Sequence, residues 1–272
     1  MYKLIACDVD GTLLDSSFAA TKEDKDAIRV AQEKGIVVSL CSGRSYKSLK
    51  AIAEDLGINP KNNYIIGFNG GVVYDYENER VVKQEELNRN AGIKAIEIFK
   101  EAQRDVEIVI YTDGENVLYE TDAQHAPVYQ KISKCDWKST DNLLETAKNL
   151  DTIVKIIFLG ENKDLKRFNM ELEGKLGSET YTVFTAEYML EVTPIVSTKA
   201  NGVKWLCQKH GIDISEAICI GDNYNDISMI KAAGLGVAVA NAVDAAKEVA
   251  DYVTKNDCSN GAVAEVINKF VL

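Results

Sequence analysis

The chain has 272 residues, enough for one large α/β domain or for two smaller domains with separate cores. Hydrophobic residues make up 46% and charged residues 27%, as in an ordinary globular protein, and no apolar run is long enough to cross a bilayer. The 42 acidic side chains outnumber the 31 basic ones, and the net charge of −11 disfavours nucleic acid as a partner while allowing a small phosphorylated ligand.

Strands and helices alternate in the first third of the chain. The apolar run Lys3–Cys7 predicts a strand buried on both faces. Thr21, followed by Asp24 three residues later, predicts the start of an amphipathic helix over Lys22–Glu33, and Gly35 ends it. The pattern then predicts a strand, a helix, a strand and a hairpin over residues 36–43, 45–56, 63–71 and 72–82.

The middle of the chain changes character, because predicted hairpins replace the regular alternation. Hairpins beside helices are typical of an α+β unit with an antiparallel sheet. The predicted elements are a helix over 91–102, strands over 106–112 and 116–120 around Asp113-Gly114, a strand over 152–160, a helix over 163–176, and a hairpin over 180–186 and 188–194.

After Pro194 the alternation returns, with helices over 199–210, 225–233 and 242–250, strands over 217–222, 235–240 and 251–254, and a final helix from about Gly261. We therefore predict an α/β fold in which a doubly wound parallel sheet is formed by residues 1–84 and 189–272. An α+β module over residues 85–188 is inserted into it, a size within the usual range of a domain.

Two of the predicted parallel strands end in aspartates. Asp8 and Asp10 follow the first strand, and "GDNYND" places Asp222 and Asp226 after a later one. In a doubly wound sheet the ligand crevice lies beyond the carboxyl ends of the strands, so we expect the four carboxylates to converge there. Hard oxygen ligands without a histidine nearby favour Mg²⁺. A polar turn would explain the first pair alone, and the second acidic motif makes that alternative weak.

A phosphate site is predicted beside the acidic residues. Ser42 and Gly43 end the second strand, where a hydroxyl and an amide can hold phosphate oxygens, although a serine there can also cap a helix. Lys199 opens the helix after Pro194, and its ammonium would neutralise a phosphate unless it is simply a solvated lysine. Arg44 could reach the phosphate or the insert, or form a surface ion pair.

Taken together, these residues resemble the haloacid dehalogenase superfamily of phosphohydrolases. "DVDGTLLD" resembles its first motif, Ser42 its second, Lys199 its third and "GDNYND" its fourth. The long insert resembles the C2-type cap of the Cof-like subfamily, which also shows glycine turns like "GFNGG". One departure is Ala200, because the family usually places glycine after the third-motif lysine. The resemblance implies a Rossmann-like core, an inserted cap domain and phosphatase activity.

The resemblance also implies a role for each residue. Asp8 would be the nucleophile that forms an aspartyl-phosphate, and Asp10 would protonate the leaving oxygen and then activate water. Mg²⁺ would be bound by the Asp8 carboxylate, the Asp10 backbone carbonyl and Asp222, with Asp226 supporting the metal site. The residues expected to hold the phosphate are Val9 through its amide, Ser42, Gly43, Lys199 and Asn225.

The expected substrates are small phosphorylated metabolites, with sugar phosphates first and phosphorylated cofactors such as a flavin or pyridoxal phosphate next. Two alternatives share part of the pattern. A phosphomutase-type phosphotransferase uses the same nucleophile and acid, and a phospho-binding regulator would be modified at Asp8 without turnover. The large insert and Asp10 disfavour the regulator.

Scattered cysteines without a CxxC pair, and an amino terminus without a visible secretion signal, favour a cytoplasmic setting away from membranes.

Overall fold

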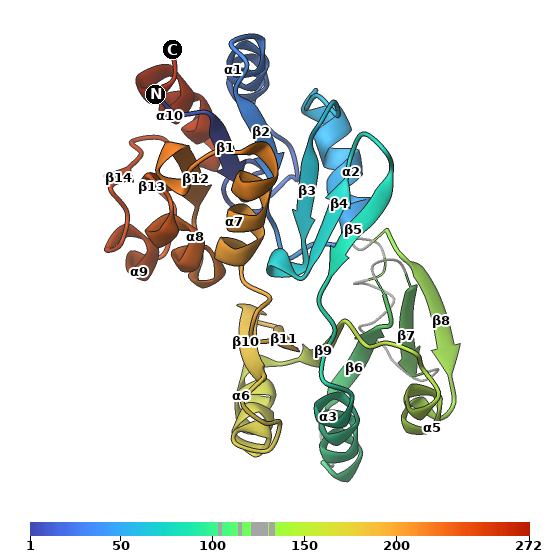
Figure 1. Ribbon diagram of the computed structural model, residues 1–272. Coiled ribbons are helices and arrows are strands. Elements are labelled where there is room, and N and C mark those ends of the chain that lie inside the picture. Colours follow the sequence, from blue (N-terminus) through green and yellow to red (C-terminus); the bar gives the residue numbers. More distant parts are fainter. Residues whose placement is uncertain (103–104, 114–115, 121–129, 131–133) are drawn as a thin grey trace. The chain divides into compact units, whose positions relative to one another are not determined.

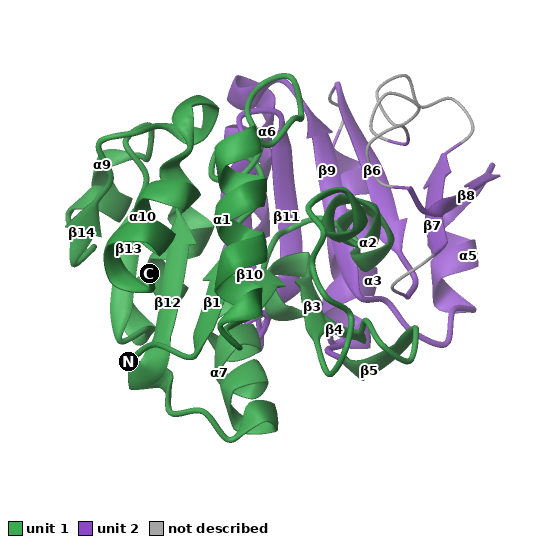
Figure 2. Cartoon of the chain, turned by 90° about the horizontal axis from the view of Figure 1, so that it is seen from above, with its two compact units in different colours: residues 1–83, 198–272 green, residues 84–197 purple. Residues whose placement is uncertain are grey.

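The computed structural model describes residues 1–272 except 103–104, 114–115, 121–129 and 131–133 (Figure 1). The chain forms two compact units, of which the first contains residues 1–83 and 198–272 and the second contains residues 84–197 (Figure 2). The predicted insert ends at residue 188, whereas the second unit continues to 197. The reason is that β11 (Met189–Pro194) pairs with both β10 (Thr180–Ala186) and β9 (Lys155–Gly160) in the sheet of the second unit.

A five-stranded parallel sheet forms the centre of the first unit. Its strand order is β14-β13-β12-β1-β2. Strand β1 (Leu4–Cys7) is fully buried and pairs with β2 (Val37–Leu40) on one side and β12 (Ala217–Gly221) on the other. The order of strands therefore reverses between β1 and β12, as predicted for a doubly wound sheet. The other elements of this unit include β13 (Leu235–Ala238), β14 (Tyr252–Val253), α1 (Lys22–Glu33), α2 (Tyr46–Asp55), α7 (Lys199–His210), α8 (Ile227–Ala232), α9 (Asp244–Lys247) and α10 (Ala262–Phe270).

A small second sheet adjoins the edge of the parallel sheet. It contains β3 (Tyr64–Gly67), β4 (Val72–Asp75) and β5 (Arg80–Gln84), in that order. An isolated parallel bridge between Cys41 and Ile66 connects it to the end of β2. Strands β3 and β4 run antiparallel, and the tight turn between them over residues 68–71 lies close to the ends of β2 and to the start of α7.

The second unit has a six-stranded sheet in the order β10-β11-β9-β6-β7-β8. Its pairs are antiparallel except for the parallel pair of β7 and β8, and an apolar core joins the sheet to its three described helices. Hairpins beside helices predict this α+β arrangement, but not β8 and α5, which have only five and six residues. The Asp113-Gly114 turn falls partly outside the described residues. The remaining bounds are α3 (Arg89–Glu101), β6 (Val106–Tyr111), β7 (Asn116–Glu120), β8 (Asp136–Thr140), α5 (Leu143–Lys148) and α6 (Asn162–Leu172).

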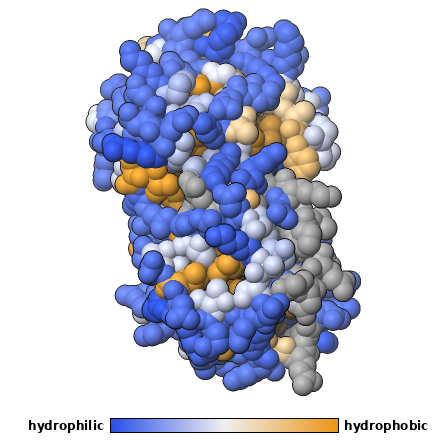
Figure 3. All heavy atoms as spheres, turned by 90° about the vertical axis from the view of Figure 1, so that its right-hand side faces the viewer, coloured by the Kyte–Doolittle hydropathy of each residue, from blue (hydrophilic) through white to orange (hydrophobic). Residues whose placement is uncertain are grey.

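The described helices are short. Helix α3 has 13 residues, which corresponds to about 20 Å, against about 30 Å for the hydrocarbon core of a bilayer. None of the helices that the structure describes has the length and apolar character needed to span a membrane. Figure 3 shows a face that is mostly hydrophilic with scattered apolar residues, in line with the charged composition.

A buried aspartate joins the starts of two helices in the first unit. Thr21 caps α1 by accepting from the amide of Asp24 at 3.1 Å, and its hydroxyl donates to Asp24 Oδ2 at 2.7 Å. The other oxygen of Asp24 accepts from the amide of Ala264 in the first turn of α10 at 2.7 Å. Because a carboxylate is favourable at a helix N-terminus, one side chain stabilises both helix starts.

We expect Asp24→Ala to lower the free energy of unfolding by about 2–3 kcal/mol, because the buried amide of Ala264 loses a charged acceptor. The control is Asp26→Ala, which removes an exposed carboxylate of the same helix and its surface pair with Lys22. The control should cost less than about 1 kcal/mol. Urea unfolding of both variants measures the difference, and equal losses would contradict a special role for Asp24.

Candidate active site

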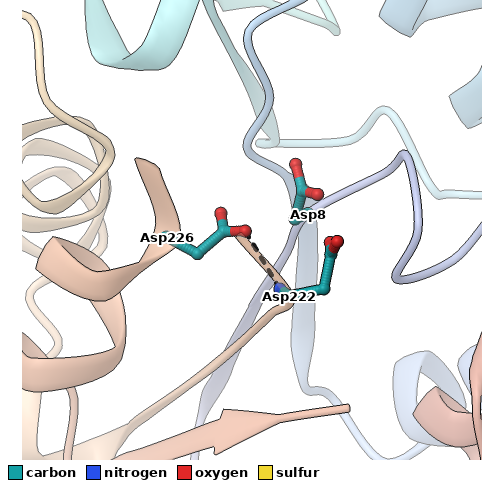
Figure 4. Close-up of side chains that lie close together, drawn as sticks. All are labelled: Asp8, Asp222 and Asp226. Atoms are coloured by element: carbon teal, nitrogen blue, oxygen red, sulfur yellow. Dashed lines mark hydrogen bonds between the residues drawn. The ribbon is translucent and has the colours of Figure 1, made fainter. Parts of the chain in front are cut away.

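Three aspartates converge at the point where the order of strands reverses. Asp8 follows β1, Asp222 follows β12, and Asp226 lies in a short 3₁₀ turn just beyond. Each offers a carboxylate oxygen, and these oxygens lie within 4.8 Å of one another. Figure 4 shows the three side chains gathered around one point. The meeting of Asp8, Asp222 and Asp226 agrees with the expectation from the strand ends.

The fully buried Asp226 holds the loop that carries Asp222. Its Oδ2 accepts from the amides of Asp222 at 3.0 Å and Asn223 at 2.9 Å, and its Oδ1 accepts from Lys199 Nζ. The loop can approach so closely because Gly221 has no side chain, since a Cβ there would lie 2.4 Å from the Cβ of Asp226. Both oxygens of Asp226 are therefore used to fix neighbouring groups.

Lys199 is the cation at the centre of the cluster. It is fully buried, and its Nζ donates to Asp8 Oδ1 at 2.5 Å as well as to Asp226. Burial alone would lower the pKa of Lys199, but the negative charges of Asp226 and Asp8 outweigh it and raise the pKa above its usual value. The ammonium is thus charged at neutral pH, and the alternative of a solvated surface lysine is wrong.

The departure at Ala200 leaves the start of α7 intact. Ala200 is buried directly after Lys199 without displacing it from the cluster. The close approach of α7 to the 68–71 turn occurs at Gly202 instead, where a Cβ would lie 3.2 Å from the Cα of Gly70 and 2.5 Å from the side chain of Ile66. Glycine is therefore required two residues further along the helix.

The cluster carries more negative than positive charge. Burial and the charges of Asp226 and Asp222 raise the pKa of Asp8 well above its usual value, although Lys199 opposes this. Burial and Asp226 also raise the pKa of Asp222 to about 6, against a hydrogen bond of 2.7 Å from the Thr12 hydroxyl. Three hard carboxylates around one ammonium fit a divalent cation such as Mg²⁺, because its charge would offset the repulsion.

The carboxylate of Asp10 does not join the other three, contrary to the expectation that all four converge. Arg44 binds it in a bidentate pair, with Nε at 2.7 Å from Oδ2 and Nη2 at 2.5 Å from Oδ1. The guanidinium also faces the ring of Phe18, 5.5 Å from its centroid. A fourth carboxylate in the cluster would add repulsion, whereas Arg44 supplies an opposite charge. Arg44 therefore forms an ion pair, one of the expected alternatives, and its partner is the exposed Asp10 of the motif.

The predicted phosphate-binding residues lie on segments next to Asp8. Val9 follows Asp8 directly and is buried, and its carbonyl accepts from three amides of the turn that follows. Ser42 is buried after β2, and its Oγ accepts from the amide of Arg44 at 3.3 Å. Helix α2 is capped by Ser45 instead, whose hydroxyl oxygen accepts from the amide of Ser48. Ser42 is therefore not the helix cap.

Three contacts of the site involve residues to which the motifs assigned no role. Thr12 orients Asp222, as described above, and Asn69 Oδ1 accepts from Asn225 Nδ2 at 2.9 Å. Asn241 Nδ2 donates to the carbonyl of Gly11 at 2.7 Å. Thr12 and Asn69 lie within the quoted stretches "DVDGTLLD" and "GFNGG", in which only the aspartates and glycines were given a structural or chemical meaning. Asn241 gave no local signal.

Comparisons with known proteins agree over the length of the chain. A family model described as haloacid dehalogenase-like hydrolase matches residues 5–267. YxeH of Bacillus subtilis (strain 168) is 30% identical, with 100% of this chain and 99% of YxeH covered. The 5-amino-6-(5-phospho-D-ribitylamino)uracil phosphatase YwtE of the same strain is also 30% identical, covering 95% of each. A haloacid dehalogenase-like hydrolase from Bacteroides thetaiotaomicron superposes with a TM-score of 0.87 at 29% identity, covering 98% of this chain and 99% of that one.

We expect Lys199→Met to lower the free energy of unfolding by about 3–5 kcal/mol at neutral pH, because it leaves Asp8 and Asp226 buried without their cation. The pKa of Asp8, already raised, should rise further. A carboxyl group with a higher pKa in the folded than in the unfolded protein binds its proton more tightly in the folded state, which stabilises that state at low pH. This stabilisation is lost as the pH rises through the raised pKa. The deficit of the variant should therefore be larger at about pH 8 than at about pH 5 in urea unfolding.

Lys204→Met is the matched control, because Lys204 is an exposed lysine of the same helix. It should change stability by less than about 1 kcal/mol at either pH. A Lys199→Met deficit that does not depend on pH would contradict the electrostatic explanation.

Proposed function

Because this chain belongs to the haloacid dehalogenase-like hydrolase family, we propose that it is a Mg²⁺-dependent phosphatase that hydrolyses small phosphorylated metabolites through an aspartyl-phosphate on Asp8. Membership of the family confirms the predicted resemblance to the haloacid dehalogenase superfamily. Relatives that are named as phosphatases support the class of phosphoric monoester hydrolase. The observation that carries the proposal is the buried Asp8 carboxylate, held by Lys199 beside Asp222 at the reversal of strand order.

In the first proposed step, an oxygen of Asp8 attacks the phosphorus and the bond to the leaving oxygen breaks. Lys199, Ser42 and the amides of Val9 and Gly43, with the side chain of Asn225, would hold the phosphate oxygens and stabilise their charge. Bound Mg²⁺, with the Asp8 carboxylate, the Asp10 carbonyl and Asp222 as ligands and Asp226 as support, would shield the negative charges that must approach each other.

Asp10 completes both halves of the proposed reaction. Its carboxyl would give a proton to the leaving alcohol and then take one from the water that attacks phosphorus, which releases inorganic phosphate and restores Asp8. Both oxygens of Asp10 accept from Arg44 in the structure. The proposed chemistry therefore requires the Asp10 carboxyl to leave Arg44 and turn towards the reacting oxygen.

Sugar and polyol phosphates are the substrates that we propose first. One relative is named for a substrate with a phosphorylated ribityl chain, which is a polyol phosphate. A cytoplasmic location is part of the proposal and is supported by five buried cysteines that form no disulfide: Cys7, Cys41, Cys207, Cys219 and Cys258. The second unit, residues 84–197, is proposed to act as a C2-type cap that selects the substrate and excludes water during the reaction.

A panel of phosphorylated metabolites tests the activity, with released inorganic phosphate measured in Mg²⁺ and in a chelator. We expect hydrolysis that requires Mg²⁺, with sugar phosphates among the best substrates. Asp8→Asn keeps the shape of the side chain and removes the attacking charge, so turnover should fall by about 10³-fold or more. Asp10→Asn should slow the reaction and keep Mg²⁺ binding.

Three results would contradict this proposal. Turnover by a folded Asp8→Asn protein at the rate of the parent would exclude the aspartyl-phosphate. Dependence on a bisphosphate activator without phosphate release would indicate a phosphomutase. Stable phosphorylation of Asp8 without turnover would indicate a phospho-binding regulator.

Replacement of residues 84–197 by a short glycine-serine linker tests the proposed cap. The remaining unit has its own sheet and buried core, so we expect it to fold and to bind Mg²⁺ and phosphate. Discrimination among substrates should disappear, and turnover should fall as orientation is lost. Circular dichroism checks the fold, and a folded product that keeps the parent's ranking of substrates would show that the second unit does not select them.

A further inference from the structure

We propose that Asn69 is a positioning residue of the phosphate site, which fixes the side-chain amide of Asn225 and the backbone of Ser42 and Gly43. This inference rests on the proposed function, because it concerns groups that would hold the substrate phosphate. Asn69 lies in the turn between β3 and β4 and belongs to none of the four motifs. All four residues belong to the first unit.

Three of the expected phosphate-binding residues contact Asn69. Its side chain is buried, with an exposed fraction of 3%, and its Oδ1 accepts from Asn225 Nδ2 at 2.9 Å. Its amide donates to the carbonyl of Ser42 at 3.0 Å. Its carboxamide also lies next to Gly43, where an added Cβ would be 3.3 Å from Oδ1. One residue thus connects the second motif to the fourth.

The contact with Asn225 determines which end of that amide serves as donor. An asparagine side chain carries two N–H donors on one atom and a carbonyl acceptor on the other. Since Asn69 presents an oxygen, the Asn225 nitrogen must face it, and the second N–H of that nitrogen is left for a phosphate oxygen. A reversed Asn225 amide would place two oxygens together here and would present a carbonyl to the anion, which repels it.

The backbone of the turn holds Asn69 in place. Phe68, Asn69 and Gly70 have φ values of 49°, 55° and 94°, a left-handed run that costs energy for the first two residues. The amide of Phe68 donates to the carbonyl of Arg44 at 3.0 Å. Gly70 lies against the carbonyl of Thr198, so closely that a Cβ would be 2.1 Å from its oxygen. The turn is therefore fixed to the segments that precede both α2 and Lys199.

Asn69→Gly is the decisive variant, because glycine accepts the left-handed backbone and removes only the carboxamide. The matched control is Asn62→Gly, which makes the same exchange at an exposed asparagine with φ of 48°. Calorimetric titration with inorganic phosphate in Mg²⁺ measures the site without turnover, and p-nitrophenyl phosphate measures kcat and KM. We expect Asn69→Gly to weaken phosphate binding about 5- to 10-fold and to lower kcat/KM about 10-fold or more. Asn62→Gly should change neither by more than about 2-fold.

A double-mutant cycle with Asn225→Ala separates positioning from general stability. If Asn69 acts through Asn225, the loss of phosphate affinity caused by Asn69→Gly should be clearly smaller in the Asn225→Ala protein than in the parent. Full additivity would contradict the inference, as would phosphate affinity within about 2-fold of the parent in a folded Asn69→Gly protein. A parent protein that binds phosphate but releases none from any phosphorylated metabolite would instead contradict the proposed function.

Discussion

The arrangement of the first unit depends on one buried ammonium. A parallel sheet brings the ends of β1 and β12 together, and the aspartates at these ends would repel one another in a site from which water is largely excluded. Lys199 offsets this repulsion by donating to both Asp8 and Asp226. Lys199 is the first residue of α7, which directly follows the inserted unit. The ion pairs of Lys199 therefore fix the place at which the chain returns to the first unit. The same contact thus orients Asp8 and opposes the rise in its pKa that burial and the neighbouring aspartates cause.

The parts of the site that follow from strand topology could be predicted, and the parts that follow from side-chain pairing could not. An apolar strand that ends in aspartate places that aspartate at the edge of the sheet, which is why Asp8 and Asp222 were found from sequence. The separation of Asp10 from them depends on Arg44, whose partner cannot be read from local pattern because three alternatives satisfy a guanidinium equally well. The contact of Asn69 with Asn225 could not be predicted from the sequence for a related reason. Its glycine neighbours indicated a turn, but only the folded chain brings its oxygen to Asn225.

The boundaries of the inserted unit illustrate the same limit. Apolar and polar residues alternate in the segment from 188 to 194, as in any exposed hairpin strand. The proline that ends this segment does not coincide with the boundary between the two units. In the structure this strand forms ladders with β9 and β10, so its backbone groups are satisfied in the second sheet. Strands β7 and β8 pair in parallel across a long connection, an arrangement that hairpin signals do not predict.

Charge balance connects the resting arrangement to the proposed chemistry. Asp10 is paired with Arg44, and Asp8 and Asp226 share Lys199, whereas Asp222 forms no ion pair within the described part of the chain. Its carboxylate accepts from the Thr12 hydroxyl at 2.7 Å, and burial and the charge of Asp226 raise its pKa to about 6. A divalent cation bound here would lower the raised pKa of both Asp8 and Asp222. A dianionic phosphate arriving beside Asp8 brings further negative charge, and one ammonium cannot offset both. The charge balance of Asp8, Asp222, Asp226 and Lys199 thus supports the proposed Mg²⁺ site from the residues themselves, in addition to the resemblance to a family.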